Sequence, residues 1–117
     1  MRILLVLSHK PYDGTDVIWN GLRLAGTLTA AGDEAFIFIM NDAVDIVRES
    51  VKHPDGYFDL KQMTKDLIAD DIGVRACGTC LKRTGSRPGE MAYAGVIVSD
   101  LNDLANWVHN SDRILIF

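Results

Sequence analysis

The sequence RILLVLSHKPYDG, from Arg2 to Gly14, decides the fold class of this protein. Its first half, Arg2 to Leu7, is a continuous apolar run, which is typical of a β-strand buried on both faces. A polar loop follows that contains the turn residues Pro11, Asp13 and Gly14. A buried strand that leads through a short loop into a helix indicates an α/β domain with a parallel sheet.

The same pattern recurs along the chain. The predicted strands are Arg2–Leu7, Glu34–Met40, Gly73–Ala76, Gly95–Val98 and Arg113–Phe117. The first predicted helix begins after a cap at Thr15 or Asp16 and stops at Gly32, and a short one spans Ala43–Arg48. Two more helices begin after caps at Asp59 and Ser99. Single helical turns are predicted at Leu81–Arg83 and Glu90–Ala94. Strands that alternate with helices predict a single domain over residues 1–117. We expect a five-stranded parallel sheet with helices on both faces, a flavodoxin- or Rossmann-like three-layer sandwich.

The composition of the chain disfavours several classes of function. The chain has 117 residues, 48% of them hydrophobic, which suits one globular domain rather than a disordered chain. The net charge is −4 and the twelve Lys and Arg are scattered, so a basic face for nucleic acid is not expected. The longest apolar runs, Ile3–Leu7 and Ala35–Met40, are too short to span a bilayer, and SHKPYD after the first run is no signal-peptide cleavage site. We therefore expect a cytoplasmic protein without a membrane partner.

The two cysteines of the chain, Cys77 and Cys80, form a CGTC segment where the third predicted strand ends. In parallel sheets, ligand sites form outside the carboxyl ends of the strands. The loop Ser8–Gly14 and the pair Asn41-Asp42 reach the same edge, although Asn and Asp after a strand are interpreted here as turn or cap residues.

A CxxC segment at this edge suits nucleophilic chemistry. A helical turn that begins after Cys77 would direct backbone N–H groups at its sulfur and favour the thiolate, and Arg75, Lys82 and Arg83 add positive charge nearby. Cys80, one turn on, can resolve a mixed species by forming a disulfide with Cys77. His9 and Lys10 can face an anionic sulfur from the first loop, but solvated loop residues are the simpler interpretation.

Three alternatives to this chemistry stay open. Structural zinc needs four ligands, and one CxxC with three unpaired histidines disfavours a metal. Thioredoxin-type reduction matches the spacing but not the position after a third strand. Two inert packing cysteines are the remaining alternative, since free cysteine is among the most buried residue types. We see no GxGxxG or Walker spacing and predict no cofactor.

The ordered set of segments ACGTCLKRTG (Ala76 to Gly85), GVIVSDLNDLANWV and the terminal DRILIF resembles the DsrE/DsrF-like (DsrE/TusD-type) sulfur-relay family. The segments MNDAV and HPDGYFDLKQM extend the resemblance over nearly the whole chain. It implies a flavodoxin-like fold, homo- or hetero-oligomers, and a reactive cysteine after the third strand, a position that Cys77 matches. Many CGTC members carry an arginine directly before the closing glycine, whereas Thr84 separates Arg83 from Gly85 here.

The resulting hypothesis is a sulfurtransferase-like sulfur carrier. Cys77 holds a persulfide and passes the sulfur to a partner protein, Cys80 acts as a resolving or protective thiol, and Arg83, His9 and Lys10 support the site. The expected partners are further copies of the chain, in a trimer or hexamer, and sulfur donor and acceptor proteins. The alternatives are a non-catalytic oligomeric subunit and a dithiol redox protein that uses Cys77 and Cys80.

Overall fold

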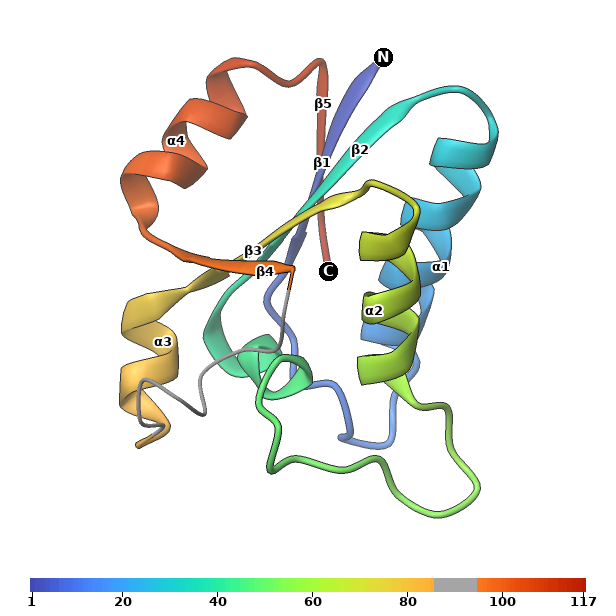
Figure 1. Cartoon of the computed structure of the whole chain (residues 1–117), viewed down its shortest axis with the longest axis vertical. Coiled ribbons are helices and arrows are strands. Elements are labelled where there is room, and N and C mark those ends of the chain that lie inside the picture. The colour runs from blue at the N-terminus through green and yellow to red at the C-terminus, as the bar shows by residue number, and fades with distance from the viewer. Residues whose placement is uncertain (86–94) are drawn as a thin grey trace.

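Five parallel strands form one sheet in the computed structural model, which describes residues 1–85 and 95–117. The strands lie in the order β4-β3-β2-β1-β5 (Figure 1). Their bounds are β1 Arg2–Leu7, β2 Glu34–Ile39, β3 Gly73–Cys77, β4 Val96–Ser99 and β5 Arg113–Ile116. All neighbouring pairs are parallel, which confirms the predicted sheet.

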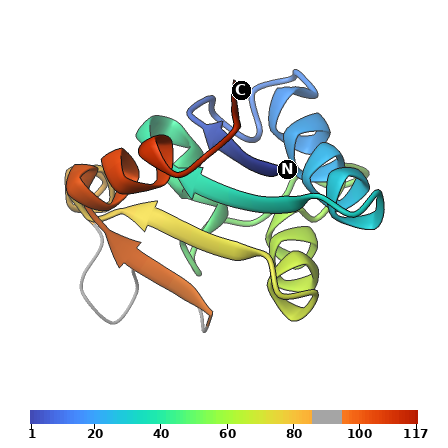
Figure 2. The same cartoon turned by 90° about the horizontal axis from the view of Figure 1, so that it is seen from above.

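Helices cover both faces of the sheet. The chain steps from β1 to β4 in one direction and then crosses back over the sheet to β5. Because strand crossovers are right-handed, this reversal places α1 and α2 on one face and α4 on the other, as Figures 1 and 2 show. The predicted three-layer sandwich is confirmed. The helical segments are α1 Val17–Ala30, η1 Asn41–Ile46, α2 Leu60–Ala69, α3 Gly78–Arg83 and α4 Leu101–His109.

The core lies on both sides of the central strands. Alternate side chains of β1, such as Leu5, pack beneath α1 and α2, and the others, such as Leu4, face α4. On the α4 side, the Trp107 ring stacks on Phe36 with ring centroids 5.3 Å apart and meets Phe38 edge-on. Burying each large apolar side chain of this kind contributes about 1.5–3 kcal/mol to stability.

Several predicted boundaries differ from the structure. Asp100, not Ser99, is the N-cap of α4, since its carboxylate accepts the Asp103 N–H at 3.0 Å. The predicted helix Ala43–Arg48 is the 3₁₀ segment η1, which begins directly after β2. The turn predicted at Glu90–Ala94 lies outside the described residues.

The apolar face of α4 is only partly used. Leu101, Leu104, Ala105 and Val108 follow helical spacing along α4, but Leu104 and Trp107 are the side chains that pack on the sheet. Leu101 and Val108 stay exposed, at 61% and 38%. One helix cannot cover a five-stranded face, so apolar surface remains on this side. Within residues 1–85 and 95–117, we find no helix with both the length and the apolar character that a membrane crossing requires.

Two glycines of α1 make a matched test of the packing between α1 and the sheet. A Cβ at Gly21 would lie 2.8 Å from the buried Leu7 Cδ2 and 3.2 Å from the Phe117 ring, whereas one at Gly26 would meet Leu67 at an ordinary 3.4 Å. We expect Gly21→Ala to lower the free energy of unfolding by about 1–2 kcal/mol, because overpacking outweighs the gain in helix propensity. Gly26→Ala should leave stability unchanged or raise it by up to about 1 kcal/mol. Urea denaturation measures both, and equal effects would contradict the packing described here.

Candidate functional site

Cys77 lies at the junction of β3 and α3. It is the last residue of β3, paired in register with Ser99 of β4, and it is also the N-cap of α3. Its Sγ accepts a hydrogen bond from the backbone N–H of Cys80, with a sulfur–nitrogen distance of 3.4 Å. Only 5% of the residue is exposed. The predicted N–H donation to this sulfur is therefore present, around a thiol that is nearly enclosed.

Cys80 lies one turn further along α3 and is partly exposed. Its Sγ accepts the backbone N–H of Asn41 at 3.2 Å. Asn41 follows the end of β2 and has a left-handed backbone conformation (φ 51°), which residues other than glycine rarely adopt. The carboxyl ends of β2 and β3 thus meet around the two thiols.

Arg83, the last residue of α3, belongs to the same group of residues. Its Nη2 forms an ion pair with Asp42 Oδ1 at 2.9 Å, and both side chains are more than half exposed. An exposed pair of this kind adds little to stability. Its positive charge nevertheless lies close enough to lower the pKa of Cys80 slightly. Burial, followed by the neighbouring Cys77, has the larger effect, so the pKa of the Cys80 thiol is raised overall.

Asn41 and Asp42 are therefore more than turn residues. Sequence reasoning assigned them to turn or cap formation, and they do begin η1. They also contact Cys80 and Arg83, respectively. The available signal was their position, because they follow the strand that neighbours β3 and parallel strands end at one edge.

A second polar group lies on the α4 side of Cys77. Arg75, two residues before Cys77 on β3, forms an ion pair with Asp103 at 2.8 Å, and its guanidinium lies over the Trp107 ring, 4.9 Å from the centroid. The Ser99 hydroxyl bonds to the same carboxylate. The positive charge predicted from Arg75 is thus compensated by Asp103, which sequence reasoning did not identify.

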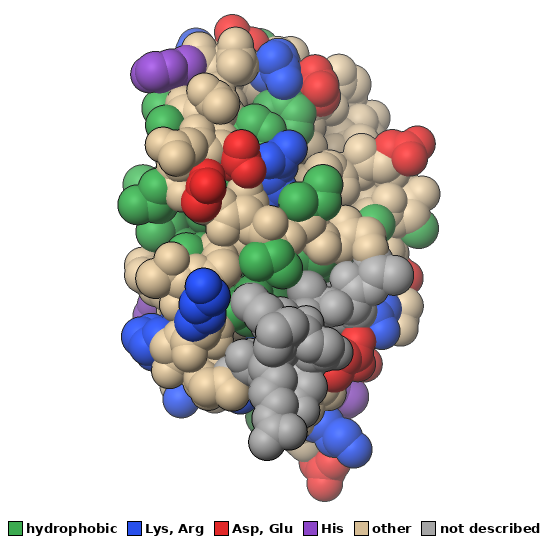
Figure 3. All heavy atoms as spheres, turned by 60° about the vertical axis from the view of Figure 1, so that its left-hand side comes forward, with side chains coloured by type: hydrophobic (Ala, Val, Ile, Leu, Met, Phe, Trp, Pro, Cys, Tyr) green, Lys and Arg blue, Asp and Glu red, His purple; other side chains and the backbone are tan. Residues whose placement is uncertain are grey.

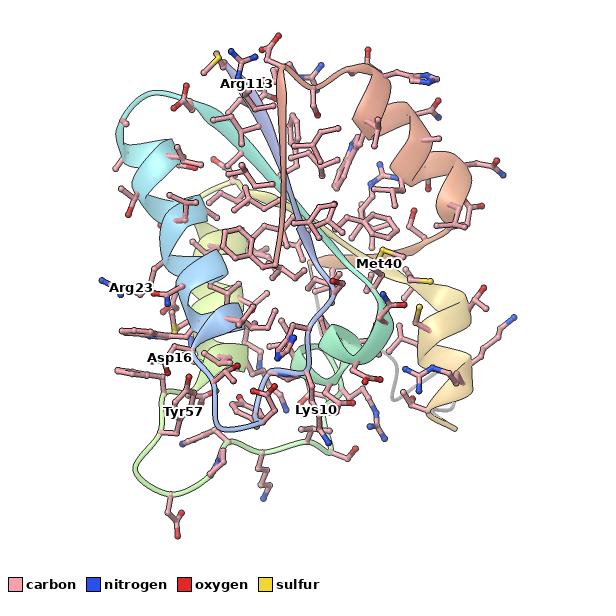
Figure 4. All side chains as sticks on the ribbon, turned by 180° about the vertical axis from the view of Figure 1, so that it is seen from behind. Lys10, Asp16, Arg23, Met40, Tyr57 and Arg113 are labelled. Carbon is pink, nitrogen blue, oxygen red and sulfur yellow. The ribbon has the colours of Figure 1, made fainter. Side chains whose placement is uncertain are left out.

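His9 and Lys10 do not contact the thiols. His9 Nε2 bonds to Asp13 within the loop after β1, and Lys10 is exposed in that loop (Figure 4). In the part of the chain that the structure describes, neither side chain hydrogen bonds to a cysteine. Met40, at the end of β2, packs beside the cysteines instead. The structure brings Cys77, Cys80 and Arg83 together and leaves His9 and Lys10 at another part of the same edge.

No metal centre is evident in residues 1–85 and 95–117, since no three His, Cys, Asp or Glu side chains gather as ligands there. What the site offers is two free thiols one helical turn apart, each accepting a backbone N–H. Such a pair can exchange thiols, hold a sulfur atom or form an internal disulfide.

Comparisons with known proteins identify a family and individual proteins that this chain is similar to. A family model described as the DsrE/DsrF-like family matches residues 1–117. "Protein YchN" of Escherichia coli is 31% identical over 118 residues, covering 99% of this chain and 98% of that protein. An uncharacterized protein of Methanopyrus kandleri, MK0008, is also 31% identical, over 98% of this chain and 93% of its own length.

Solved structures agree with the fold. The crystal structure of the E. coli ychN protein superposes with a TM-score of 0.87 at 30% identity, covering 100% of this chain and 99% of that one. MTH1491 of Methanobacterium thermoautotrophicum, a protein of unknown function, has a TM-score of 0.76 at 12% identity, over 99% of this chain and 98% of that one. The second likeness shows the fold alone.

The raised pKa of Cys80 can be tested by alkylation. We expect the rate of its reaction with iodoacetamide to rise with pH and to reach its midpoint above the ordinary value of 9.0. Cys77→Ala should lower the midpoint, because the neighbouring thiol is one cause of the shift, and Arg83→Gln should raise it, because a favourable positive charge is lost. Peptide mass spectrometry follows the rate at each pH. A midpoint at or below 9.0, or shifts of the opposite sign, would show that the thiols are not coupled in this way.

Proposed function

This chain belongs to the DsrE/DsrF-like family, and from that premise we propose that it is a cytoplasmic sulfur carrier, in which Cys77 holds a persulfide and passes the sulfur to a partner protein. The observation that carries the proposal is the position of Cys77, whose sulfur receives the N–H of Cys80 at the carboxyl edge of the sheet. A donated N–H stabilises a sulfur anion. The reaction as proposed uses no cofactor.

The transfer step is balanced without an oxidant. The Cys77 thiolate attacks the outer sulfur of a persulfide on a donor protein, a sulfur–sulfur bond forms to Cys77 Sγ, and the bond within the donor persulfide breaks. The donor leaves as a thiolate, and the transferred sulfur carries the negative charge or a proton from solvent. Delivery to an acceptor thiolate repeats the same exchange in the other direction.

Burial supports a storage role for Cys77 and an access role for its neighbour. Cys77 is 5% exposed, which shields a persulfide from reductants in solution. Cys80 is partly exposed beside it, with Arg83 at the same end of α3. In this proposal, Cys80 acts as a resolving or protective thiol beside Cys77, and Arg83, paired with Asp42, supports the site.

Two other functions have specific support. A dithiol redox protein is favoured by the closeness of the Cys80 N–H to Cys77 Sγ, because the two thiols lie one turn apart. A non-catalytic subunit is favoured by the near-complete burial of Cys77, since an inert cysteine is typically enclosed. The experiment below separates these functions from the carrier.

Intact mass after incubation with a small-molecule persulfide donor tests the carrier. We expect an adduct of one sulfur atom that is absent in Cys77→Ser and retained in Cys80→Ser. An adduct retained in Cys77→Ser but absent in Cys80→Ser would transfer the carrier role to Cys80. A loss of two hydrogen masses, reversed by dithiothreitol and without added sulfur, indicates the redox protein, and an unmodified chain indicates the non-catalytic subunit.

We further propose that the carrier works as a homo-oligomer, a trimer or hexamer, through the face that carries α4. Ile114 and Ile116 of β5 pair in register with Leu4 and Val6, so all four side chains point to the α4 side. Trp107 of α4 packs on Phe36 and Phe38 of β2, while Ile114 and Ile116 of β5 are 41% and 72% exposed.

The other edge of this face is also apolar. Ile97 of β4 is 55% exposed and pairs with Arg75, which places it on the α4 side too, and Leu101 at the start of α4 is 61% exposed. Figure 3 shows apolar side chains on this face of the molecule. A second copy of the chain is the occupant that supplies an equally apolar surface, and the family resemblance implies such assemblies. Several exposed apolar side chains on one face of a protein favour an interface there.

Sedimentation equilibrium tests the assembly. We expect the wild-type chain to sediment as a trimer or hexamer at micromolar concentration. Replacing Ile114 and Ile116 together with Glu should raise the dissociation constant by at least about ten-fold, since each buried isoleucine contributes about 1.5–3 kcal/mol. Phe58→Ser, which removes an exposed apolar side chain from the loop before α2, is the control and should not change the mass. A monomeric wild type would contradict the proposal.

A further inference from the structure

A cavity of about 340 Å³ lies between the loop after β1 and the loop before α2. Its volume suits a small molecule. It opens at the carboxyl edge of the sheet, beside β1, the strand at which the chain order reverses between β2 and β5. Ligands of open α/β sheets bind at such positions. The cavity is lined by Tyr12, Gly14, Thr15, Pro54, Asp55, Gly56 and Tyr57.

Two tyrosine rings form fixed walls of this cavity. The rings of Tyr12 and Tyr57 are nearly perpendicular, with centroids 6.1 Å apart. The Tyr57 hydroxyl donates to Asp16 Oδ1 at 3.0 Å, and Figure 4 shows these two side chains together at this corner of the molecule. The Tyr12 hydroxyl accepts the Leu60 N–H at 3.3 Å. Because both hydroxyls are bonded, the rings are held in place.

The neighbouring aromatic side chains already hold one cation. The Arg23 guanidinium lies over the Trp19 ring at 4.2 Å, and Trp19 stacks on Phe58 with centroids 4.4 Å apart. Phe58 in turn contacts the Tyr57 ring at 5.5 Å. Aromatic faces attract cations through their quadrupole, most strongly when the cation is weakly hydrated. The Tyr12 and Tyr57 rings of the cavity adjoin this aromatic group, and among the described residues no guanidinium lies over them.

Charge at the cavity also favours a cation. Asp55 is a lining residue, and the described lining contains no Lys, Arg or His. Asp13 and Asp16 flank it, and the Thr15 hydroxyl and N–H hold the pKa of Asp13 at about 2, so this carboxylate is charged at neutral pH. His9, bonded to Asp13, lies at this flank. Lys52, His53 and Lys61 line a neighbouring hollow that also includes Asp55, and there His53 lies 3.7 Å from Asp59 and Lys61 4.0 Å from Glu49. Burial, followed by the nearby Asp16, raises the pKa of Tyr57, as expected where the potential is negative.

We propose that this cavity binds a small organic ammonium ion, whose alkyl groups pack on Tyr12 and Tyr57 while its charge faces Asp55. A metal ion fits less well, because Mg²⁺ and Ca²⁺ need several oxygen ligands and the lining supplies one carboxylate. An alkylated ammonium needs apolar contact and a diffuse negative field instead. This site is independent of the sulfur chemistry at Cys77.

Choline is the probe, and its uncharged isostere, in which a tert-butyl group replaces the trimethylammonium group, is the matched control ligand. We expect choline to shift the amide resonances of Thr15 and Gly56 saturably, with a Kd between about 0.1 and 10 mM. The isostere should bind at least about ten-fold more weakly, because a cation–π contact and a facing carboxylate together contribute about 1.4 kcal/mol or more. Sodium chloride at equal ionic strength should cause no saturable shift.

Variants separate the contribution of the Asp55 charge to binding from that of the Tyr57 ring. Asp55→Asn, an exposed position, should weaken choline binding by about ten-fold and leave the isostere unchanged, while Tyr57→Leu should weaken both ligands. Asp70→Asn removes an exposed carboxylate beyond the cavity, at the end of α2, and should change neither. The absence of saturable binding, equal affinity for the isostere, or unchanged choline affinity in Asp55→Asn would each overturn the proposal. The amide spectrum of each variant reports its fold, and Asp55→Asn keeps the test valid if Tyr57→Leu unfolds.

Discussion

The structure depends on the central strand β1, which is hydrogen-bonded to β2 on one side and to β5 on the other. Every side chain from Ile3 to Leu7 is buried, so both faces of this strand must be covered by helices. A strand with apolar side chains on both faces keeps them buried only where both faces of the sheet are covered. Parallel pairing around it directs all five carboxyl ends to one edge, and that edge carries both sites described above.

The two thiols show how burial and reactivity are divided between neighbours. Cys77 receives its hydrogen bond because it ends β3 and caps α3, and the same position encloses it. Cys80 is more accessible, but burial and the adjacent thiol raise its pKa. Cys77 thus accepts a backbone N–H in an enclosed position, whereas contact with a partner is easier at the partly exposed Cys80. This division suits a carrier, in which holding the sulfur and meeting the partner are separate requirements.

The carboxyl edge divides into two chemically different regions. At the ends of β2 and β3, thiols and backbone N–H groups face one another, and the exposed Arg83–Asp42 ion pair lies beside them. At the end of β1, tyrosine rings and Asp55 line a cavity. The first region suits an anionic sulfur species and the second a cation. A single edge of a parallel sheet can hold both because each strand is followed by its own loop.

The sequence by itself determined the strands and the thiol position. The runs predicted as strands over Arg2–Leu7 and Glu34–Met40 allow few structures besides buried strands, and CGTC was expected where the third strand ends, which is where Cys77 lies. The partners of these residues were decided by the tertiary structure. Asn41 reaches Cys80 across 39 positions of sequence, and Tyr57 meets Asp16 across 41, because crossover connections bring distant loops to one edge. Periodicity and spacing report which residues share one element, but contacts between loops depend on strand order and register, which only the folded sheet sets.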